Sequence, residues 1–327
     1  MSRTTTIRDY DGDADIDERW RALWQASAQR SPFSQPSYLH AAAAASGLRL
    51  RVHLVSEARG DVAGCAVWWR RRGPYREVVI PPFTPFSAVL LREEPLEADV
   101  HARRSPVESL LASLESSYDV LRLHLPPGMD DIRPAVWRGW QSRPLYTYTL
   151  DLTSAEAESA DGWSASAARN FRRHRSEYDI VEADAESCTT LCAAGYERNG
   201  RRLPLGADRL APLIERLVDE GCASTYGARS KTSGRIEAAV AVLHDTRTAV
   251  YWVAGSVPGP AMTVLIGEVL PTLAGNGFSR FDFMGANTPP IAEFKRRFGS
   301  ELQQYQRLSL LTRRELRLLD ALKRFLR

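Results

Sequence analysis

Lysine is nearly absent from this sequence, which has 3 lysines and 40 arginines among its 327 residues. No run approaches the roughly 18 apolar residues of a membrane-spanning helix, so we expect no membrane span. The N-terminus has no apolar stretch of the kind found in secretory signals. The four cysteines have no further Cys or His at ligand spacing, which argues against a zinc site. We therefore expect a cytoplasmic protein with reduced cysteines and no metal.

The composition is that of a globular protein, with 44% hydrophobic and 25% charged residues. The length suits two domains of roughly 150 residues each. The formal net charge is only +3. Any attraction to phosphate or nucleic acid must therefore come from a local patch and not from the overall field.

The order of expected elements is repeated along the chain. After an acidic N-terminal tail, helices are followed by a meander of antiparallel strands and then by helix, strand, helix and strand. The same order recurs in the second half, which predicts a duplicated α/β unit. The polar segment 153–161 lacks periodicity, so we place the boundary there, giving domains 1–155 and 156–327.

A proline-rich segment, 81–86, follows the first strands. Three prolines within it exclude the interior of a sheet. We expect an exposed connection whose aromatic residues, Phe83 and Phe86, lie at the rim of a binding pocket.

One of the three lysines lies in an unusual segment. Phe281-Asp282-Phe283-Met284-Gly285 predicts a short strand that ends at a glycine, where a backbone can approach a ligand. The following helix places Phe294 and Phe298 on its buried face, beside Lys295. An ammonium on a rigidly packed helix near a strand end can hold a phosphate or a developing oxyanion. The alternative is a solvated helix face with one lysine among basic neighbours.

A basic helix is predicted from residue 163 onward. Helical spacing places Arg169, Arg172 and Arg173 on one face, while Ala167 and Phe171 face the core. Guanidinium groups on one stripe repel one another and give bidentate contacts to phosphate oxygens. We expect this face to meet a phosphate or a nucleic acid. The alternative is a solvated basic face offset by acidic residues.

Four segments together resemble the Fem-type and related acyltransferases built on tandem GNAT domains. They are the Arg-Asn-x-Arg-Arg helix, Gly234-Arg-Ile-Glu-Ala-Ala, Phe281-Asp-Phe-Met-Gly and Phe294-Lys-x-x-Phe-Gly. The resemblance implies an α/β tandem GNAT fold: two similar domains, each with a mixed, mainly antiparallel sheet flanked by helices. The first half matches only in its element order.

The resemblance also implies an activity and a site. In that family an activated acyl or aminoacyl group moves to an amine. Lys295 and Phe294 would then belong to the substrate or catalytic pocket, and Arg169 and Arg173 would hold phosphates of the donor or acceptor. By position, Tyr251 and Trp252 would line the groove for the donor.

Two segments depart from related proteins. Acetyl-CoA-dependent GNAT enzymes carry a glycine-rich turn whose amides cradle a pyrophosphate, but here 255–267 contains two prolines, which lack an amide hydrogen. Cell-wall members carry Pro-Arg-Gly-Pro where this chain has 82–86. These departures argue against an orthodox coenzyme A cradle and against a UDP-linked peptidoglycan precursor as acceptor.

Acyl transfer from a reactive ester or thioester needs no nucleophile from the enzyme, and no Ser/His/Asp arrangement stands out. Asp282 could act directly, or could accept a hydrogen bond at the strand end or pair with Lys295. Glu237 could serve as a base through water, or could be a solvated strand residue.

Three functions fit these features. The first is an aminoacyltransferase that takes its acyl group from aminoacyl-tRNA and passes it to an amine acceptor. The second is an acyl-CoA-dependent N-acetyltransferase acting on an amino sugar or another small amine. The third is a catalytically inactive protein that binds a phosphate ligand or nucleic acid. The proline-rich turn favours the first over the second, although the small net charge disfavours extensive tRNA contact. In each case the donor is a co-substrate, and we expect no tightly bound cofactor.

Overall fold

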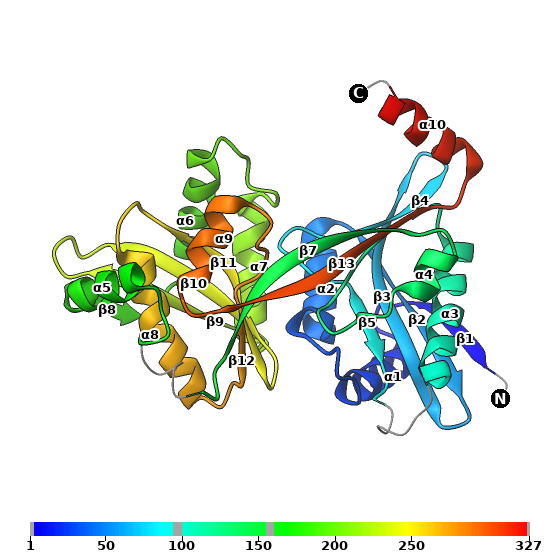
Figure 1. Ribbon diagram of the computed structural model, residues 1–327, viewed down its shortest axis with the longest axis horizontal. Helices are drawn as coiled ribbons and strands as arrows, with labels where there is room; N and C mark the ends of the chain where they lie inside the picture. The colour runs from blue at the N-terminus through cyan, green and yellow to red at the C-terminus, as the bar shows by residue number, and fades with distance from the viewer. Residues whose placement is uncertain (1–2, 94–99, 155–159, 326–327) are drawn as a thin grey trace. The chain divides into compact units, whose positions relative to one another are not determined.

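The structure, a computed structural model, describes residues 3–93, 100–154 and 160–325 (Figure 1). The chain forms two compact units. The first consists of Met1–Pro144 and Tyr305–Arg327, and the second of Leu145–Gln304. The chain therefore enters the second unit once and returns to the first.

The first unit is a sheet with helices packed on it. Its strands are β1 (Thr4–Asp9), β2 (Arg49–Glu57), β3 (Gly60–Arg72), β4 (Tyr75–Val79), β5 (Ala88–Leu91), β6 (Val120–Leu125) and the later part of β13 (Glu301–Leu311). The packed helices are α1 (Ala14–Gln25), α2 (Pro36–Ser46), α3 (Val100–Ser117) and α4 (Arg133–Trp137), with a 3-10 turn at Pro32–Ser34. The last helix, α10 (Arg314–Phe325), follows β13 and is largely exposed, including Leu318, Leu319 and Leu322. The sheet order is β1-β2-β3-β4-β6-β13, and β5 pairs with β3.

The second unit is built in the same way. Its strands are the later part of β7 (Gln141–Asp151), β8 (Tyr178–Val181), β9 (Ala223–Ser230), β10 (Ile236–His244), β11 (Thr248–Ser256) and β12 (Arg280–Asp282). Its helices are α5 (Ala165–His174), α6 (Ala185–Arg198), α7 (Ala207–Asp219), α8 (Ala261–Gly275) and α9 (Pro289–Arg296), with a 3-10 turn at Arg175–Glu177. The sheet order is β8-β9-β10-β11-β12-β7.

The strand directions show that the two sheets follow one plan. In the first unit the pairs from β1 to β4 are antiparallel, β4 and β6 are parallel, and β6 and β13 are antiparallel. In the second unit β8 to β11 are antiparallel, β11 and β12 are parallel, and β12 and β7 are antiparallel. The expected pair of similar α/β units, each with a mixed and mainly antiparallel sheet, is confirmed.

The last strand of each sheet comes from the other half of the sequence. β7 follows the elements of the first unit but pairs with β12, and β13 follows those of the second unit but pairs with β6. The two halves thus exchange their final strands. For this reason the compact units differ from the predicted division at residue 155, which assigned residues 305–327 to the second domain and β7 to the first. Pairing between strands so distant in sequence leaves no local signal.

Most expected helices and strands are present, with three differences. The acidic N-terminal tail contains β1, whose Thr4 pairs with Ser56 of β2. The short strand β5 was not expected. The expectation of an exposed proline-rich segment is wrong at most of its positions: Thr84 and Phe86 are buried, and Phe86 packs against Phe33 and Tyr305. The prolines avoid the sheet, but the aromatic ring fills the core of the first unit.

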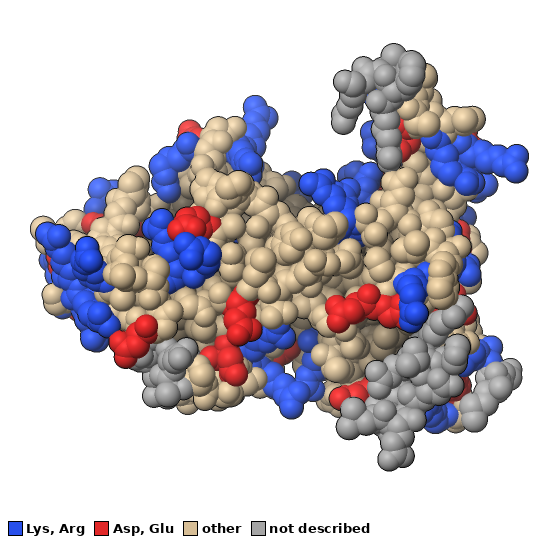
Figure 2. Space-filling view, viewed as in Figure 1, with Lys and Arg blue, Asp and Glu red and all other residues tan. Residues whose placement is uncertain are grey.

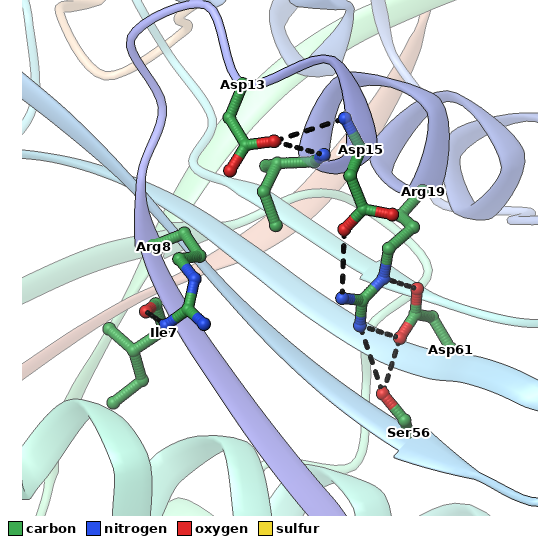
Figure 3. Close-up of polar contacts among 8 residues, drawn as sticks. Ile7, Arg8, Asp13, Asp15, Arg19, Ser56 and Asp61 are labelled. Carbon is green, nitrogen blue, oxygen red and sulfur yellow. Dashed lines mark hydrogen bonds and ion pairs between the residues drawn. The ribbon is translucent and has the colours of Figure 1, made fainter.

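Helix α1 is fixed at its start and along its polar face (Figure 3). The carboxylate of Asp13 accepts hydrogen bonds from the amides of Asp15 and Ile16, which caps the first turn. Arg19 donates two bonds, of 2.9 and 2.8 Å, to the buried carboxylate of Asp61. This fork ties α1 to the start of β3, while Ile16, Trp20 and Leu23 enter the core.

In the second unit, α6 and α8 cover opposite faces of the sheet. Gly255 of β11 lies against α6, since a methyl group there would come within 2.1 Å of the backbone of Leu191. Its neighbour Ala254 packs against the cluster that contains α8. Successive strand residues point to opposite faces, so the two helices sandwich β11.

Replacing Gly255 by alanine should destabilise the second unit. The added methyl group would meet backbone atoms of α6, which cannot rotate away as a side chain can. We expect the free energy of unfolding to fall by about 2–3 kcal/mol, measured by chemical denaturation. Gly275→Ala is the matched control, because no described atom lies within 4 Å of a methyl group there. Equal stability of the two variants would contradict the close packing of α6 on β11.

Candidate active site

Lys295 points into the second unit and not toward solvent. Its side chain is buried, with 6% of the residue surface exposed. Nζ donates hydrogen bonds to the carbonyl oxygens of Met284 and, at 3.0 Å, of Gly285. It also lies 5.7 Å from the centre of the Tyr251 ring. The alternative of a solvated lysine is excluded, because burial of an ammonium requires partners such as these.

The loop after β12 is shaped to receive this ammonium. Met284 has a left-handed backbone with φ of 56°, which is unfavourable for a residue with a side chain. Its carbonyl and that of Gly285 both accept from Nζ, so the lysine offsets the cost of the turn. An ammonium has three N–H groups. No described residue accepts a hydrogen bond from the third.

Asp282 supports the same loop from beneath. Its Oδ1 accepts hydrogen bonds from Thr147 Oγ1 at 2.5 Å and from the Met284 amide at 2.7 Å. Burial raises the pKa of this carboxyl group, and the hydrogen bonds from Thr147 and Met284 oppose that rise. Of the roles foreseen for Asp282, the structure shows the hydrogen-bond acceptor at the strand end.

The charges of Asp282 and Lys295 influence each other. Burial lowers the pKa of the Lys295 ammonium to about 8, and the nearby Asp282 carboxylate opposes this shift. The lysine is therefore still protonated at neutral pH but close to titration. A lysine poised in this way is a frequent feature of functional sites.

An aromatic cluster holds α9 in place. Phe298 stacks on Phe283 with ring centres 5.5 Å apart, and it also contacts Phe294 at 5.1 Å and Trp163 at 4.8 Å. Tyr251 reaches Phe283 at 6.2 Å. This packing fixes the helix that carries Lys295, because interlocked rings leave few alternative rotamers.

A pocket of about 360 Å³ lies where α5, the start of α8 and the end of α9 meet. We call it the arginine pocket, and its lining residues are Ser166, Ala167, Arg169, Asn170, Arg173, His174, Thr263, Phe294, Arg297 and Phe298. Figure 2 shows Lys and Arg side chains gathered over the region of α5. Thr263 belongs to the first turn of α8, where amide groups and the helix dipole favour an anion.

The arginines of α5 divide into two groups. Arg169 and Arg173 line the arginine pocket and have no acidic partner among the described residues. Arg172 instead pairs with Asp161 at 2.9 Å, outside the pocket. Arg175, in the 3-10 turn that follows α5, pairs with Glu268 at 3.1 Å. Thus the predicted basic face is real, but only part of it faces the pocket.

Phe294 joins the two predicted features. Its ring lines the arginine pocket and packs on Phe298, while the next residue, Lys295, turns inward toward Tyr251. The fold therefore brings together Arg169, Arg173 and α9, which are more than a hundred residues apart in sequence.

Four other expected site residues lie elsewhere. Glu237 accepts hydrogen bonds from Tyr178 at 2.9 Å and Ser233 at 3.1 Å. Trp252 is buried at a register shift of β11 against β10. Phe83 is half-buried in the first unit, and its carbonyl accepts a hydrogen bond from Tyr38. Phe86 belongs to the core of that unit. No described contact links these four residues with Lys295.

Two residues of the site escaped sequence reasoning. Thr147 holds the Asp282 carboxylate from a strand more than a hundred residues earlier, and a lone threonine in a strand gives no signal. Arg297 lines the arginine pocket and lies inside the Phe294–Gly299 motif, so its position beside Phe294 could have drawn attention to it.

In the part of the chain that the structure describes, no group of three or more His, Cys, Asp or Glu residues could hold a metal ion. None of its helices combines the length and apolarity needed to cross a membrane. The four cysteines are buried and unpaired with one another.

The buried cationic site and its surrounding sheet can be compared with known proteins. Residues 164–296, which hold both Arg169 and Lys295, match the family described as the acetyltransferase (GNAT) domain. The second unit therefore contains a GNAT-type acyltransferase domain. No curated protein matches this acyltransferase.

Solved structures extend the likeness of this acyltransferase to both units. FemX has a TM-score of 0.70 at 10% identity, covering 92% of this chain and 96% of FemX. L-PGS from Bacillus licheniformis has a TM-score of 0.57 at 12% identity, with 94% of each chain covered. A tandem GNAT protein from the clavulanic acid biosynthesis pathway has a TM-score of 0.56 at 13% identity, covering 95% of this chain and 99% of that one. The expected Fem-type tandem GNAT fold is confirmed.

Proposed function

We propose that this acyltransferase is a Fem-type aminoacyltransferase, which passes an aminoacyl group from aminoacyl-tRNA to an amine acceptor in the cytoplasm. The observation that carries the proposal is the arginine pocket, where Arg169 and Arg173 lack acidic partners among the described residues and lie beside the first turn of α8. Phosphate oxygens of a donor fit this cationic pocket, because guanidinium groups bind them in pairs of hydrogen bonds.

Lys295 is proposed to act on the reacting carbonyl group. When the amine attacks the ester carbonyl, negative charge develops on the carbonyl oxygen, and the third N–H of the ammonium can donate to it. The carbon–nitrogen bond forms, the ester bond breaks, and the hydroxyl of the tRNA terminus leaves with a proton from the attacking amine. No enzyme nucleophile is required, and the described contacts give Asp282 the task of holding the loop that positions Nζ.

The second candidate is transfer from an acyl-CoA, as is common for GNAT folds. It is favoured by the match to a domain described as an acetyltransferase. Pro258 and Pro260 lie directly before α8, so amides are missing where a glycine-rich turn would supply them. Within the first turn of α8, Thr263 still lines the arginine pocket. The lack of these amides makes tRNA the preferred donor.

The donor can be identified by direct binding. Charged tRNA and coenzyme A are titrated into the intact protein, followed by calorimetry. We expect charged tRNA to bind and coenzyme A to bind at least tenfold more weakly. Tight coenzyme A binding without tRNA binding would establish the second candidate in place of the first.

Replacing Arg169 and Arg173 together by glutamine should weaken tRNA binding by about tenfold at low salt, because two charge-assisted contacts are lost. The slope of log K against log salt should become shallower by about 1.5, which corresponds to two phosphate contacts. Fluorescence anisotropy at several salt concentrations measures both quantities.

A double variant at Arg175 and Arg296 is the matched control. It removes the same charge, but these arginines pair with Glu268 and Glu293 and do not line the arginine pocket. If the control flattened the salt dependence as strongly as the Arg169 and Arg173 variant, net charge alone would explain the effect and the pocket would lose its role.

A further inference from the structure

The first unit contains a cavity of about 530 Å³ between α3 and the sheet. Leu110, Leu111 and Leu114 of α3 form one wall, and Leu123 and Leu125 of β6 form another. These leucines belong to the hydrophobic core cluster of the unit. The cavity is thus a hollow in the core, unrelated to the site around Lys295 in the second unit.

The size of the cavity is that of a ligand site. Protein interiors are closely packed, and a water molecule occupies only about 30 Å³ of the liquid. Binding sites for small molecules range from about 300 to about 1,000 Å³. An empty apolar space of about 530 Å³ would destabilise the unit, since each lining side chain loses contacts there.

The walls admit hydrocarbon but few polar groups. Cys65 is fully buried, and burial raises the pKa of its thiol to about 12, so it lines the cavity as a neutral group. Among the described lining residues, the other polar side chains are those of Gln29, Arg92, Glu93, Asp130 and Asp131. A sugar or nucleotide would leave its hydroxyl groups without partners on these walls, at a high cost.

The charged residues that line the cavity lie on the side that opens to solvent. Glu93, Asp130 and Asp131 are exposed to solvent. Arg92 donates to the carbonyl of Asp61 at 2.7 Å. Asp131 pairs at 2.8 Å with Arg133, which does not line the cavity. The lining residues therefore offer the carboxylates of Glu93 and Asp130 and a single guanidinium, which is already engaged with the backbone. This rim favours a cationic head group over an anionic one.

We propose that the first unit binds an amphiphile with an unbranched hydrocarbon chain and a cationic amine head, the chain lying among the leucines of α3 and β6 and the head at the acidic rim. This site is separate from the proposed transfer site and does not depend on it. An amine of this kind has the chemistry of an acyl acceptor, but its binding to the first unit can be measured without any donor.

The test compares probes of different chain length and charge on the full-length protein. Butyl-, octyl- and dodecyltrimethylammonium and dodecanoate are titrated by calorimetry below their micelle concentrations. We expect one site per chain and an affinity that rises up to about fourfold for each added methylene group until the cavity is filled. Dodecyltrimethylammonium should bind several-fold more tightly than dodecanoate. Affinity independent of chain length would overturn the site, and tighter binding of dodecanoate would overturn the cationic head.

Leu111→Trp tests whether the cavity itself binds the probe. The larger ring should fill the hollow, weaken dodecyltrimethylammonium binding at least tenfold and leave the melting temperature unchanged or higher. Leu121 belongs to the same core cluster but does not line the cavity, so Leu121→Trp should instead lower the melting temperature sharply. A smaller replacement, Ala135→Leu, provides a second filling variant. Unchanged probe binding in a folded filling variant would exclude the cavity.

A substitution in the second unit separates this proposal from the proposed function. Lys295→Met should leave dodecyltrimethylammonium binding as in the wild type, and Leu111→Trp should leave the salt dependence of tRNA binding unchanged. If Lys295→Met abolished binding of the amphiphile, the probe would occupy the second unit and the first-unit site would be wrong.

Discussion

Replacing Lys295 by methionine is expected to lower the rate of acyl transfer by about 100- to 1,000-fold, the loss typical for removal of a group that stabilises an oxyanion. Methionine keeps the length and the buried hydrocarbon of the side chain but cannot donate to the developing charge. A single-turnover experiment measures the chemical step directly when the enzyme is in excess over the charged tRNA and its concentration is well above KM. A loss confined to KM would indicate binding and not transition-state stabilisation.

The same substitution should also reduce stability, and the control must allow for this. The carbonyl groups of Met284 and Gly285 lose their donor, which costs about 1–3 kcal/mol. Phe281→Leu should cause a comparable loss of stability, because Phe281 of β12 is buried against Phe283. Phe281 does not line the arginine pocket. At a temperature where both variants are folded, Phe281→Leu should retain transfer. If both variants lost activity equally, Lys295 would have only a structural role.

The pKa of Lys295 is expected to be lower than that of an ordinary lysine. Burial lowers its pKa from 10.5 to about 8, with the Asp282 carboxylate opposing the shift. The protein has only 3 lysines, so labelling lysine Cε with ¹³C gives few resonances, each assigned by substitution. A Lys295 resonance that titrates at its ordinary pKa would show that the ammonium is hydrated, contrary to the buried site.

Asp282→Asn tests the electrostatic coupling. Removing the carboxylate removes the influence that raises the pKa of Lys295, so the Lys295 midpoint should move further down. Asparagine can still accept from Thr147 and from the Met284 amide, which preserves the loop. An unchanged midpoint would mean that the two groups do not interact.

The depressed pKa of Lys295 fixes the sign of two pH effects. Between about pH 8 and 10.5 the unfolded chain binds more protons at this residue than the folded chain, so this group makes the protein more stable as pH rises. The rate of acyl transfer should instead decrease as pH rises. If the ammonium stabilises the oxyanion, the rate falls above about pH 8. A rate that rises through this range would instead identify neutral Lys295 as a base.

Several features of this protein follow from the sequence alone. Helical and strand periodicity, together with turn residues, predicted nearly every element of both units, because these signals depend on neighbours within a few residues. The spacing around Arg169 and around Phe294 was enough to predict a basic helix and a packed lysine-bearing helix. Their combined order predicted the Fem-type GNAT fold.

Long-range pairing decided the rest. The exchange of β7 and β13 between the two sheets, and the hydrogen bond from Thr147 to Asp282, join residues more than a hundred positions apart, so no local pattern reports them. The burial of individual side chains was also decided only by the folded structure. Phe86 is in a core although its proline-rich segment resembles an exposed connection. Lys295 points inward onto two carbonyl groups, whereas the sequence left open a solvated helix face. The sequence by itself determined the elements and the chemistry available, while tertiary packing alone decided which arginines face a common pocket and which charge is held out of water.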